Sequence, residues 1–373
     1  MLLKRKTAAP QQEPVSTPFS RTHIRGLGLA CAAGDQPFSL LGAVGTSLSA
    51  ATPHPVLTIV DSAGEETPAI FAPVPGLDPL AGREERIAAL AAAALGSALE
   101  QWASDSERQK VLVLTLLPTM AEDEVRELEM LLREELPDLG PATLRFVQGS
   151  EGALAELKNV CRDLAAGTWK TVIFGGADSL VNADSCRELL QQDRLAAATS
   201  AEGIFPGEAA AYLVLQADQP ETRAIKSHAT ITAIEQAPEP HAGQAGDKQM
   251  TGLAQAVEGV AKQGEIRLDD VKELILTLSA ESASELEWHQ TLMRLWPPGF
   301  PANKDNSPQD PQPLRLHPTL GELGAATLPV ALALGCARFE FEHPAISSLL
   351  VCDGSEAMLR GAVCLQAPPA AAP

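Results

Sequence analysis

Short apolar segments alternate along this chain with longer segments of helical periodicity, and this alternation limits the possible folds more than any other feature. Apolar runs that predict strands lie at residues 110–117, 143–147, 171–174, 209–216, 229–235 and 273–278. Apolar residues spaced three and four apart predict helices at residues 83–102, 122–136, 154–164, 251–263, 285–295 and 323–337. Strands separated by helices are typical of α/β proteins, whose mostly parallel sheets are covered by helices. We therefore expect an α/β fold.

The two halves of the chain show a similar order of elements, which predicts a duplicated fold. We expect an N-terminal half at 21–216 and a C-terminal half at 217–366. A polar, flexible lead-in is expected at 1–20, and a low-complexity, disordered tail at 367–373.

Three details of the second half are also predicted. The strand at 229–235 is expected to pair beside the strand at 209–216. The runs at 347–352 and 362–365 predict a closing hairpin. The proline-rich stretch at 297–318 is expected to be a surface loop, because proline lacks the amide N–H that a strand ladder needs.

The charge balance excludes several classes of partner. The 373 residues include 28 Lys and Arg against 48 Asp and Glu, which gives a net charge of −20. Contacts to phosphate groups need a basic face, so we expect neither a nucleic acid nor an anionic membrane surface as a partner. No apolar stretch reaches the roughly 20 residues of a membrane-spanning helix, and the first residues lack the apolar core of a signal peptide.

The cysteines and histidines indicate no metal site. The six cysteines are far apart and form no Cys-x-x-Cys pair. We expect them to be small core residues of a protein in the reducing cytoplasm. The seven histidines are scattered. Because no group of side chains has the spacing of metal ligands, we expect no metal and no other cofactor.

The most informative segments are two glycine-bearing runs. The first is Gly175-Gly176-Ala177-Asp178-Ser179, and the second extends from Gly203 through Gly207 and Glu208 to Leu215. Glycines permit close approach of backbones and sharp turns into strands. On this reasoning alone, the two runs are structural turns.

Together the two runs resemble the β-ketoacyl synthase branch of the thiolase-like superfamily, in which a Gly-Gly-Ala-acid strand end precedes a Gly-Phe-x-x-Gly-Glu-Gly-Ala strand. Further similar segments follow the family order: Arg25 to Gly34, Gly140-Pro141-Ala142, Gly324-Ala325-Ala326, and Cys352-Asp353-Gly354-Ser355. The resemblance implies a duplicated α/β/α/β/α layered fold with two mixed, mostly parallel five-stranded sheets. It also implies a structural role for the motif residues Gly175, Gly176, Gly207, Glu208, Gly324 and Gly354.

Ketosynthases of this family use a cysteine nucleophile at a helix N-terminus and two histidines that donate hydrogen bonds to a developing enolate. Counting back from Gly175 puts Ser150 at the nucleophile position, and counting forward from Gly140 puts Gly149 there. The nearest cysteine, Cys161, lies about three helical turns further on. The nucleophilic thiol is therefore expected to be absent.

The two histidine positions are substituted as well. Glu281 stands at the first and Gly321 at the second, and Leu316 replaces the lysine that precedes the second histidine in the family. An ionised carboxylate accepts hydrogen bonds and would repel an enolate, while glycine offers no donor. The resemblance thus implies a fold whose condensation chemistry has been lost, with no catalytic residue expected.

Three functional hypotheses remain open. The first is a catalytically degenerate pseudoenzyme acting as a scaffold, adaptor or partner subunit. It could be a chain-length-factor-like subunit or an accessory protein of a bacterial gene cluster, including clusters for protein secretion. The second is an acyltransferase or hydrolase of altered mechanism that uses Ser150 as nucleophile, with Glu281 as base or acid. The third is that only the α/β architecture is shared.

The resemblance also implies a protein partner. Family dimers pair through the strand before the nucleophile, here Thr143 to Val147, so we expect a homodimer or a heterodimer through that strand. Acyl carrier proteins are strongly acidic. The net charge of −20 therefore argues against an acyl carrier protein as partner.

Overall fold

The computed structural model of the chain describes residues 19–60, 64–102, 110–149, 152–196, 203–220, 226–242, 244, 248–297, 310–341, 345–354 and 358–368. Most of the expected lead-in (1–18), the end of the expected tail (369–373) and the middle of the proline-rich stretch (298–309) lie outside these residues. None of the helices in the described ranges is long and apolar enough to cross a membrane.

The N-terminal half contributes five strands to the main sheet. They are β1 (Thr22–Cys31), β4 (Val111–Leu117), β5 (Thr143–Gln148), β6 (Thr171–Ser179) and β7 (Glu208–Ala217). Their order across the sheet is β1-β7-β6-β4-β5, and every residue of β1, β4, β6 and β7 is buried. Burial on both faces explains why these strands are nearly continuous apolar runs in the sequence.

The C-terminal half repeats the same arrangement. Its strands are β8 (Ala229–Pro238), β9 (Glu273–Leu276), β10 (Gln312–Arg315), β11 (Ser348–Asp353) and β12 (Leu359–Gln366). Their order is β8-β12-β11-β9-β10. In each half the first two pairings are antiparallel and the last two are parallel. The expected duplicated fold of mixed five-stranded sheets is therefore confirmed, and the expected hairpin is the antiparallel pair β11–β12.

The two five-stranded sheets are joined edge to edge into one ten-stranded sheet. The seam consists of three antiparallel residue pairs between β1 and β8, namely Thr22↔Ile231, His23↔Thr230 and Ile24↔Ala229. The expectation that β8 pairs beside β7 is wrong, because both edges of β7 are occupied by β1 and β6. β8 instead pairs with β1 and β12.

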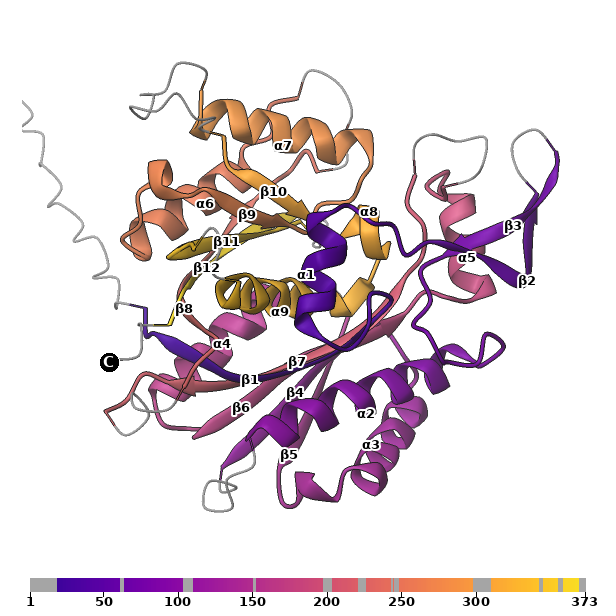
Figure 1. Cartoon of the computed structure of the whole chain (residues 1–373), viewed down its shortest axis with the longest axis horizontal. Helices are drawn as coiled ribbons and strands as arrows, with labels where there is room; N and C mark the ends of the chain where they lie inside the picture. The colour runs from indigo at the N-terminus through magenta and orange to yellow at the C-terminus, as the bar shows by residue number, and fades with distance from the viewer. Residues whose placement is uncertain are drawn as a thin grey trace, which may run out of the picture.

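Helices form three layers around the two halves of the sheet (Figure 1). The helices α4 (Ala153–Ala165) and α9 (Thr327–Glu340) lie between the two halves. The helices α2 (Arg83–Trp102) and α3 (Glu122–Glu135) cover the outer face of the first half, and α6 (Gly252–Gln263) and α7 (Ser282–Leu295) cover the outer face of the second. The result is the expected α/β/α/β/α layering, with a central helix α9 that is buried from Thr327 to Arg338.

One expectation for the proline-rich stretch is wrong. Residues 312–315 form the strand β10, which pairs in parallel with β9 and includes Pro313. The strand tolerates a proline because β10 is the last strand of the sheet, so one of its edges needs no partner.

Two smaller elements flank the layers. The strands β2 (Thr52–Val60) and β3 (Glu66–Phe71) form a separate two-stranded sheet that packs on the helix α5 (Ala183–Gln191), at the right of Figure 1. This hairpin was not predicted, because Pro53, Pro55 and Pro68 interrupt its strand pattern. The helix α1 (Pro37–Gly45) packs near α9.

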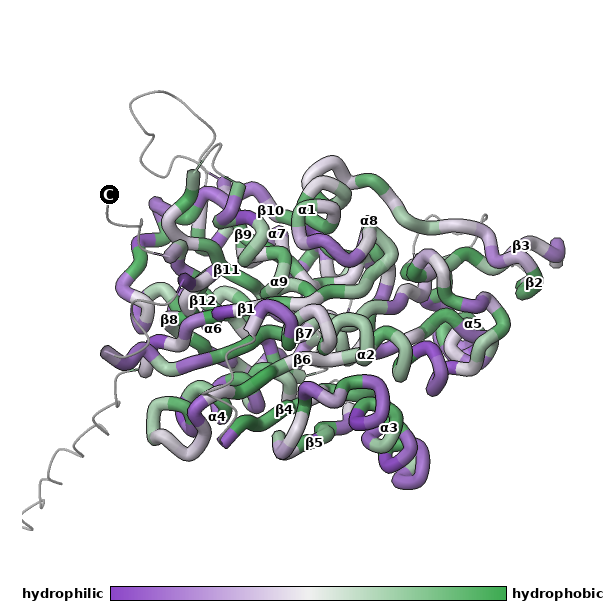
Figure 2. Tube along the Cα trace, turned by 60° about the horizontal axis from the view of Figure 1, so that its bottom comes forward, coloured by the Kyte–Doolittle hydropathy of each residue, from purple (hydrophilic) through white to green (hydrophobic). Residues whose placement is uncertain are grey.

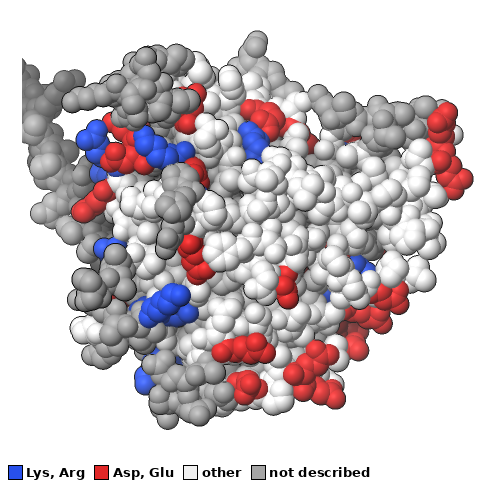
Figure 3. All heavy atoms as spheres, in the orientation of Figure 1, with Lys and Arg blue, Asp and Glu red and all other residues white. Residues whose placement is uncertain are grey.

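Hydrophobic residues gather in the strands and central helices, while α3 is largely hydrophilic (Figure 2). Acidic side chains cover the exposed side of α3 in the lower part of Figure 3. This helix alone carries Glu122, Asp123, Glu124, Glu127, Glu129, Glu134 and Glu135.

Candidate functional site

The expected nucleophile position lies at the turn between β5 and the central helix α4. Gly149 follows the strand with φ 91° and donates its N–H to the carbonyl of Leu117 at 2.8 Å. Gly152, at φ 95°, is the N-cap residue of α4. A Cβ added at either glycine would meet no atom within 4 Å, so backbone conformation favours glycine here and crowding does not. Ser150 lies outside the described residues.

Glu281, which the motif count expects at the first histidine position, is held in an ion pair. It is the N-cap residue of α7, and Arg194 donates hydrogen bonds to both of its carboxylate oxygens at 2.8 Å. The hydroxyl of Ser279 donates a third, also at 2.8 Å. These hydrogen bonds, with Arg194 contributing most, hold the pKa of Glu281 below its usual range. A carboxylate stabilised in its charged form is a poor proton acceptor.

Gly321, which the motif count expects at the second histidine position, has no room for a side chain. It follows the short helix α8 (His317–Leu320) with φ 73°. A Cβ at this position would lie 2.4 Å from the carbonyl oxygen of Phe205. Leu316, which is expected at the lysine position, is fully buried. Neither position can therefore present a donor to a substrate.

The nearby imidazole of His317 has a structural role, because both of its nitrogens lie near polar groups of the protein. Its Nε2 lies 2.7 Å from the carbonyl oxygen of Thr277, which can only accept, so Nε2 carries the hydrogen. Its Nδ1 lies 3.7 Å from a carboxylate oxygen of Glu322. The ring is buried between these two groups and connects α8 to the end of β9.

The glycine motif residues lie where backbones and side chains meet at close range. A Cβ at Gly176 would lie 2.5 Å from the carbonyl oxygen of Ala325, and one at Gly207 would lie 2.0 Å from that of Leu320. Gly324, at φ 52°, faces the carboxylate of Asp178, which a Cβ would approach to 2.0 Å. A Cβ at Gly175 would lie 2.2 Å from the ring of Tyr212, and one at Gly354 would lie 2.4 Å from the side chain of Leu278. The close approaches at Gly176, Gly207 and Gly324 place the segment 316–326 against the end of β6 and the start of β7.

Glu208 forms a buried ion pair that was not predicted from the sequence. Its carboxylate accepts hydrogen bonds from Arg86 Nε at 2.7 Å and Arg86 Nη2 at 2.5 Å, and from the Ser179 hydroxyl at 2.8 Å. Both charged side chains are at most 1% exposed. The sequence pattern gave a weak signal, a single arginine on the apolar side of the alanine-rich helix α2.

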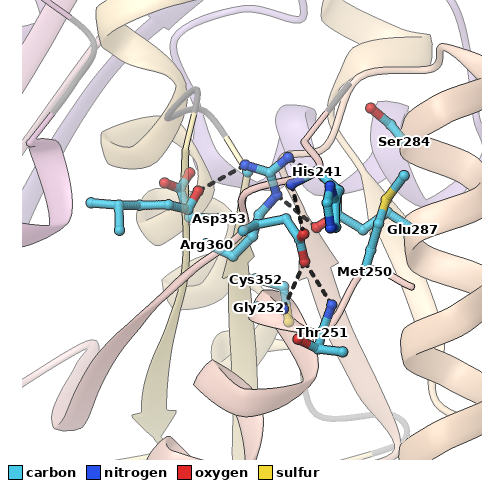
Figure 4. Close-up of polar contacts among 12 residues, drawn as sticks. His241, Met250, Thr251, Gly252, Ser284, Glu287, Cys352, Asp353 and Arg360 are labelled. Atoms are coloured by element: carbon cyan, nitrogen blue, oxygen red, sulfur yellow. Dashed lines mark hydrogen bonds and ion pairs between the residues drawn. The ribbon is translucent and has the colours of Figure 1, made fainter. Parts of the chain in front are cut away.

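A second buried polar cluster lies in the C-terminal half (Figure 4). Arg360 of β12 donates to both oxygens of Glu287 of α7, at 2.7 and 3.0 Å. Beside it, the carboxylate of Glu239 accepts from the backbone N–H groups of Thr251 and Gly252 at the start of α6, at 2.6 and 2.8 Å. These contacts connect the end of β8 with α6 and connect β12 with α7. The cluster therefore stabilises the packing of the two helices on the sheet. No sequence pattern predicts this cluster.

The cysteines all lie among the residues that the structure describes. All six cysteines are buried, free thiols. Burial raises the pKa of the Cys161 thiol to about 12. Four cavities formed by described residues lie elsewhere, and none of the four is lined by Gly149, Glu281 or Gly321. No group of three or more His, Cys, Asp or Glu side chains within the described ranges could hold a metal ion.

Known structures share this fold over nearly the whole chain. The ishigamide ketosynthase/chain length factor superposes with a TM-score of 0.69 at 15% identity, over 93% of this chain and 99% of that chain. A β-ketoacyl synthase from Burkholderia phymatum gives 0.69 at 13% identity, over 93% and 99%. A type II PKS acyl-carrier protein in complex with its ketosynthase bound to the hexaketide gives 0.73 at 11% identity, over 94% and 100%.

The structure therefore has the thiolase-like fold of the β-ketoacyl synthases and chain length factors. The resemblance deduced from the glycine motifs is confirmed at this level. No protein-family model matches the sequence, and no curated protein matches it either.

Proposed function

We propose that this protein is a non-condensing member of the ketosynthase fold class that acts as a partner subunit, in the manner of a chain length factor. The main support for the proposal is the crowding around Gly321, the residue expected at the second histidine position. At Gly321 a carbonyl oxygen would lie 2.4 Å from any Cβ, so no imidazole can be accommodated there. Each hydrogen-bond donor removed from an oxyanion hole costs about 10²–10³ in rate.

The first histidine position supports the same proposal. Glu281 accepts three hydrogen bonds from Arg194 and Ser279. An enolate placed beside it would meet a negative carboxylate that is already fully hydrogen-bonded. The two positions that bind the developing charge in a ketosynthase would therefore both be inactive here.

The same geometry weakens the alternative of a hydrolase or acyltransferase that uses Ser150. A serine nucleophile needs an adjacent base that is free to accept its proton. The carboxylate of Glu281 has a lowered pKa and is engaged by Arg194. A fluorophosphonate probe checks this alternative directly, since labelling of Ser150 would support it.

The partner is expected to bind at the strand β5, and the protein is expected in the cytoplasm. An acyl carrier protein remains a less favoured partner because of the net charge of −20. An accessory role in a bacterial gene cluster, including one for secretion, is the other form that a partner function could take. Mass spectrometry of the complex purified at native expression distinguishes these forms.

The chemical test uses the purified protein with malonyl and acyl thioesters. We expect no CO₂ release above the buffer rate and no acyl adduct by intact-protein mass spectrometry. An active ketosynthase in the same assay is the positive control. An adduct on this chain, or CO₂ release that depends on it, would contradict the proposal.

A further inference from the structure

A cavity of about 290 Å³ lies between the hairpin β2–β3 and the helix α5, the elements at the right of Figure 1. Its apolar lining includes Leu57, Ile59 and Val60 of β2, Ala69 of β3, and Leu190 of α5. Sites for small molecules begin at about 300 Å³, so this cavity has the size of a small ligand site. Neither Glu281 nor Gly321 lines it, so it is separate from the expected ketosynthase positions.

Apolar side chains are exposed where this cavity opens to solvent. Val60 is 60% exposed and Leu190 is 44% exposed, and both line the cavity. On α5 the lining residues Ala183, Cys186 and Leu190 follow one another at spacings of three and four, so one face of the helix is turned toward the cavity. Exposed apolar surface that leads into a cavity is typical of a binding site.

The wall that β2 contributes is fixed by the side chain of His54. Its Nδ1 accepts hydrogen bonds from the N–H groups of Val56 and Leu57 at 3.2 and 2.9 Å, and its Nε2 lies 3.2 Å from the carbonyl oxygen of Pro79. These contacts hold the irregular stretch of β2, between Pro53 and Thr58, where its register with β3 shifts. Because the wall is held in place without a ligand, binding would not have to order it.

The polar groups of the described lining are few, which restricts the chemistry of an occupant. They are the side chains of Thr58, Cys186 and Arg187. The Thr58 hydroxyl donates to Glu66 at 2.7 Å, and a thiol is only a weak donor. A peptide would bring backbone N–H and C=O groups that lose their hydrogen bonds to water on entering. An aliphatic chain carries no such groups, so the lining favours an aliphatic chain over a peptide.

Arg187 is the only cation among the described lining residues. Its side chain is largely exposed, so its charged end lies on the solvent side of the cavity. The guanidinium donates a hydrogen bond to Asp184, which is itself exposed. An exposed ion pair of this kind contributes little, and a guanidinium has five N–H donors, so Arg187 can bind a further carboxylate. The charge therefore favours an anionic end on the aliphatic chain.

We propose that this cavity binds a medium-chain carboxylate, such as octanoate or decanoate, with its carboxylate on the guanidinium of Arg187. The aliphatic chain lies between β2 and α5 and contacts Leu57, Ile59 and Leu190. Binding is non-covalent and does not depend on the partner function proposed above.

Equilibrium dialysis of the full-length protein against labelled hexanoate, octanoate and decanoate, below the concentrations at which they form micelles, tests the site. We expect decanoate to bind with a dissociation constant below about 1 mM. Each added methylene should tighten binding about fourfold, the effect of burying one methylene group. Absence of decanoate binding, or equal binding of the three acids, would overturn the proposal.

Two tryptophan variants locate the bound chain. Leu190→Trp should fill the cavity and weaken decanoate binding at least tenfold. Leu131→Trp on α3 is the matched control, because Leu131 is a similarly exposed helical leucine away from the cavity, and this variant should bind as the wild type does. Wild-type affinity in Leu190→Trp would place the chain elsewhere and overturn the proposal.

The charged end is tested with Arg187→Gln. This variant should weaken decanoate binding about threefold, the effect of an exposed ion pair, and leave the binding of uncharged decanol unchanged. An equal loss for both ligands, or no loss for decanoate, would contradict the placement of the carboxylate on Arg187.

Cys186 reports on the cavity in the unmodified chain, which keeps the proposal testable if Leu190→Trp folds poorly. At about ten times the dissociation constant of decanoate, its reaction with a thiol reagent should slow about tenfold, because the cavity is then mostly filled. Peptide mapping identifies the labelled thiol. Unchanged reactivity, or protection by an apolar tripeptide and not by decanoate, would overturn the proposal.

Discussion

Arg194 and Glu281 are joined by two hydrogen bonds of 2.8 Å although 87 residues separate them in the sequence. The guanidinium comes from the segment that follows α5 in the first half, and the carboxylate stands at the start of α7 in the second. The pair thereby connects the two halves at the position where the resemblance to ketosynthases would place a histidine.

Replacing Glu281 by Gln should change how stability responds to acid. The lowered pKa of Glu281 means that its contribution is present above its unfolded value of about 4.5 and is lost as the pH falls through the folded value. The two side chains are 41% and 24% exposed, so we expect about 1 kcal/mol at neutral pH. Urea denaturation from pH 3 to 7 measures the effect. Equal acid sensitivity in the wild type and the variant would contradict this prediction.

Two glycines with positive φ should respond differently to alanine. Gly149→Ala meets open space and should cost about 1 kcal/mol, the price of a left-handed backbone alone. Gly321→Ala adds a close contact with the Phe205 carbonyl and should cost about 3 kcal/mol. The free energies of unfolding of the two variants are compared directly. Similar losses would show that the segment after α8 can shift to accept a side chain.

Breaking the buried pair between Arg86 and Glu208 should destabilise the protein strongly. Arg86→Met leaves the Glu208 carboxylate uncompensated in the core, with an expected loss of about 3–5 kcal/mol. The exposed pair of Arg126 with Glu122 provides the control, because Arg126→Ala should change stability by about 0.5 kcal/mol or less. A small effect of Arg86→Met would mean that water reaches the carboxylate.

The thiols should be inert in the folded protein. Burial raises the pKa of Cys31 and Cys352 to about 12 and that of Cys186 and Cys364 to about 11. A chromogenic disulfide reagent should therefore react slowly at neutral pH and titrate all six thiols only after unfolding. Cys186, which lines the cavity between β2 and α5, should react first. Cys186→Ser should remove that first phase, and a phase that persists would assign it to another thiol.

The sequence predicted secondary structure best for helices that bury one face and for strands that are buried on both faces. The helix over 83–102 and the strand over 111–117 were predicted within one residue, because burial alone sets their patterns. The errors concern relations between elements. The partners of β8 depend on which edges are already occupied, and β10 tolerates Pro313 because it is an outer strand.

At the candidate site, too, local sequence predicted the residues but not the contacts between distant segments. Counting along the motifs indicated Glu281 and Gly321 without the structure. The local sequence could not indicate that Arg194 would neutralise Glu281 or that the Phe205 carbonyl would crowd Gly321, since both contacts come from distant segments. Long-range contacts also explain why Arg86, Glu239, Glu287 and Arg360 were missed.

The short seam between β1 and β8 has a mechanical consequence. Three residue pairs turn two sheets into a single ladder that begins at β10 and ends at β5. If two copies associate through β5, ten strands from each would share one uninterrupted system of backbone hydrogen bonds. Such an assembly would end at both outer margins on the strand that carries Pro313, so growth would stop at two chains and a fibre would not form.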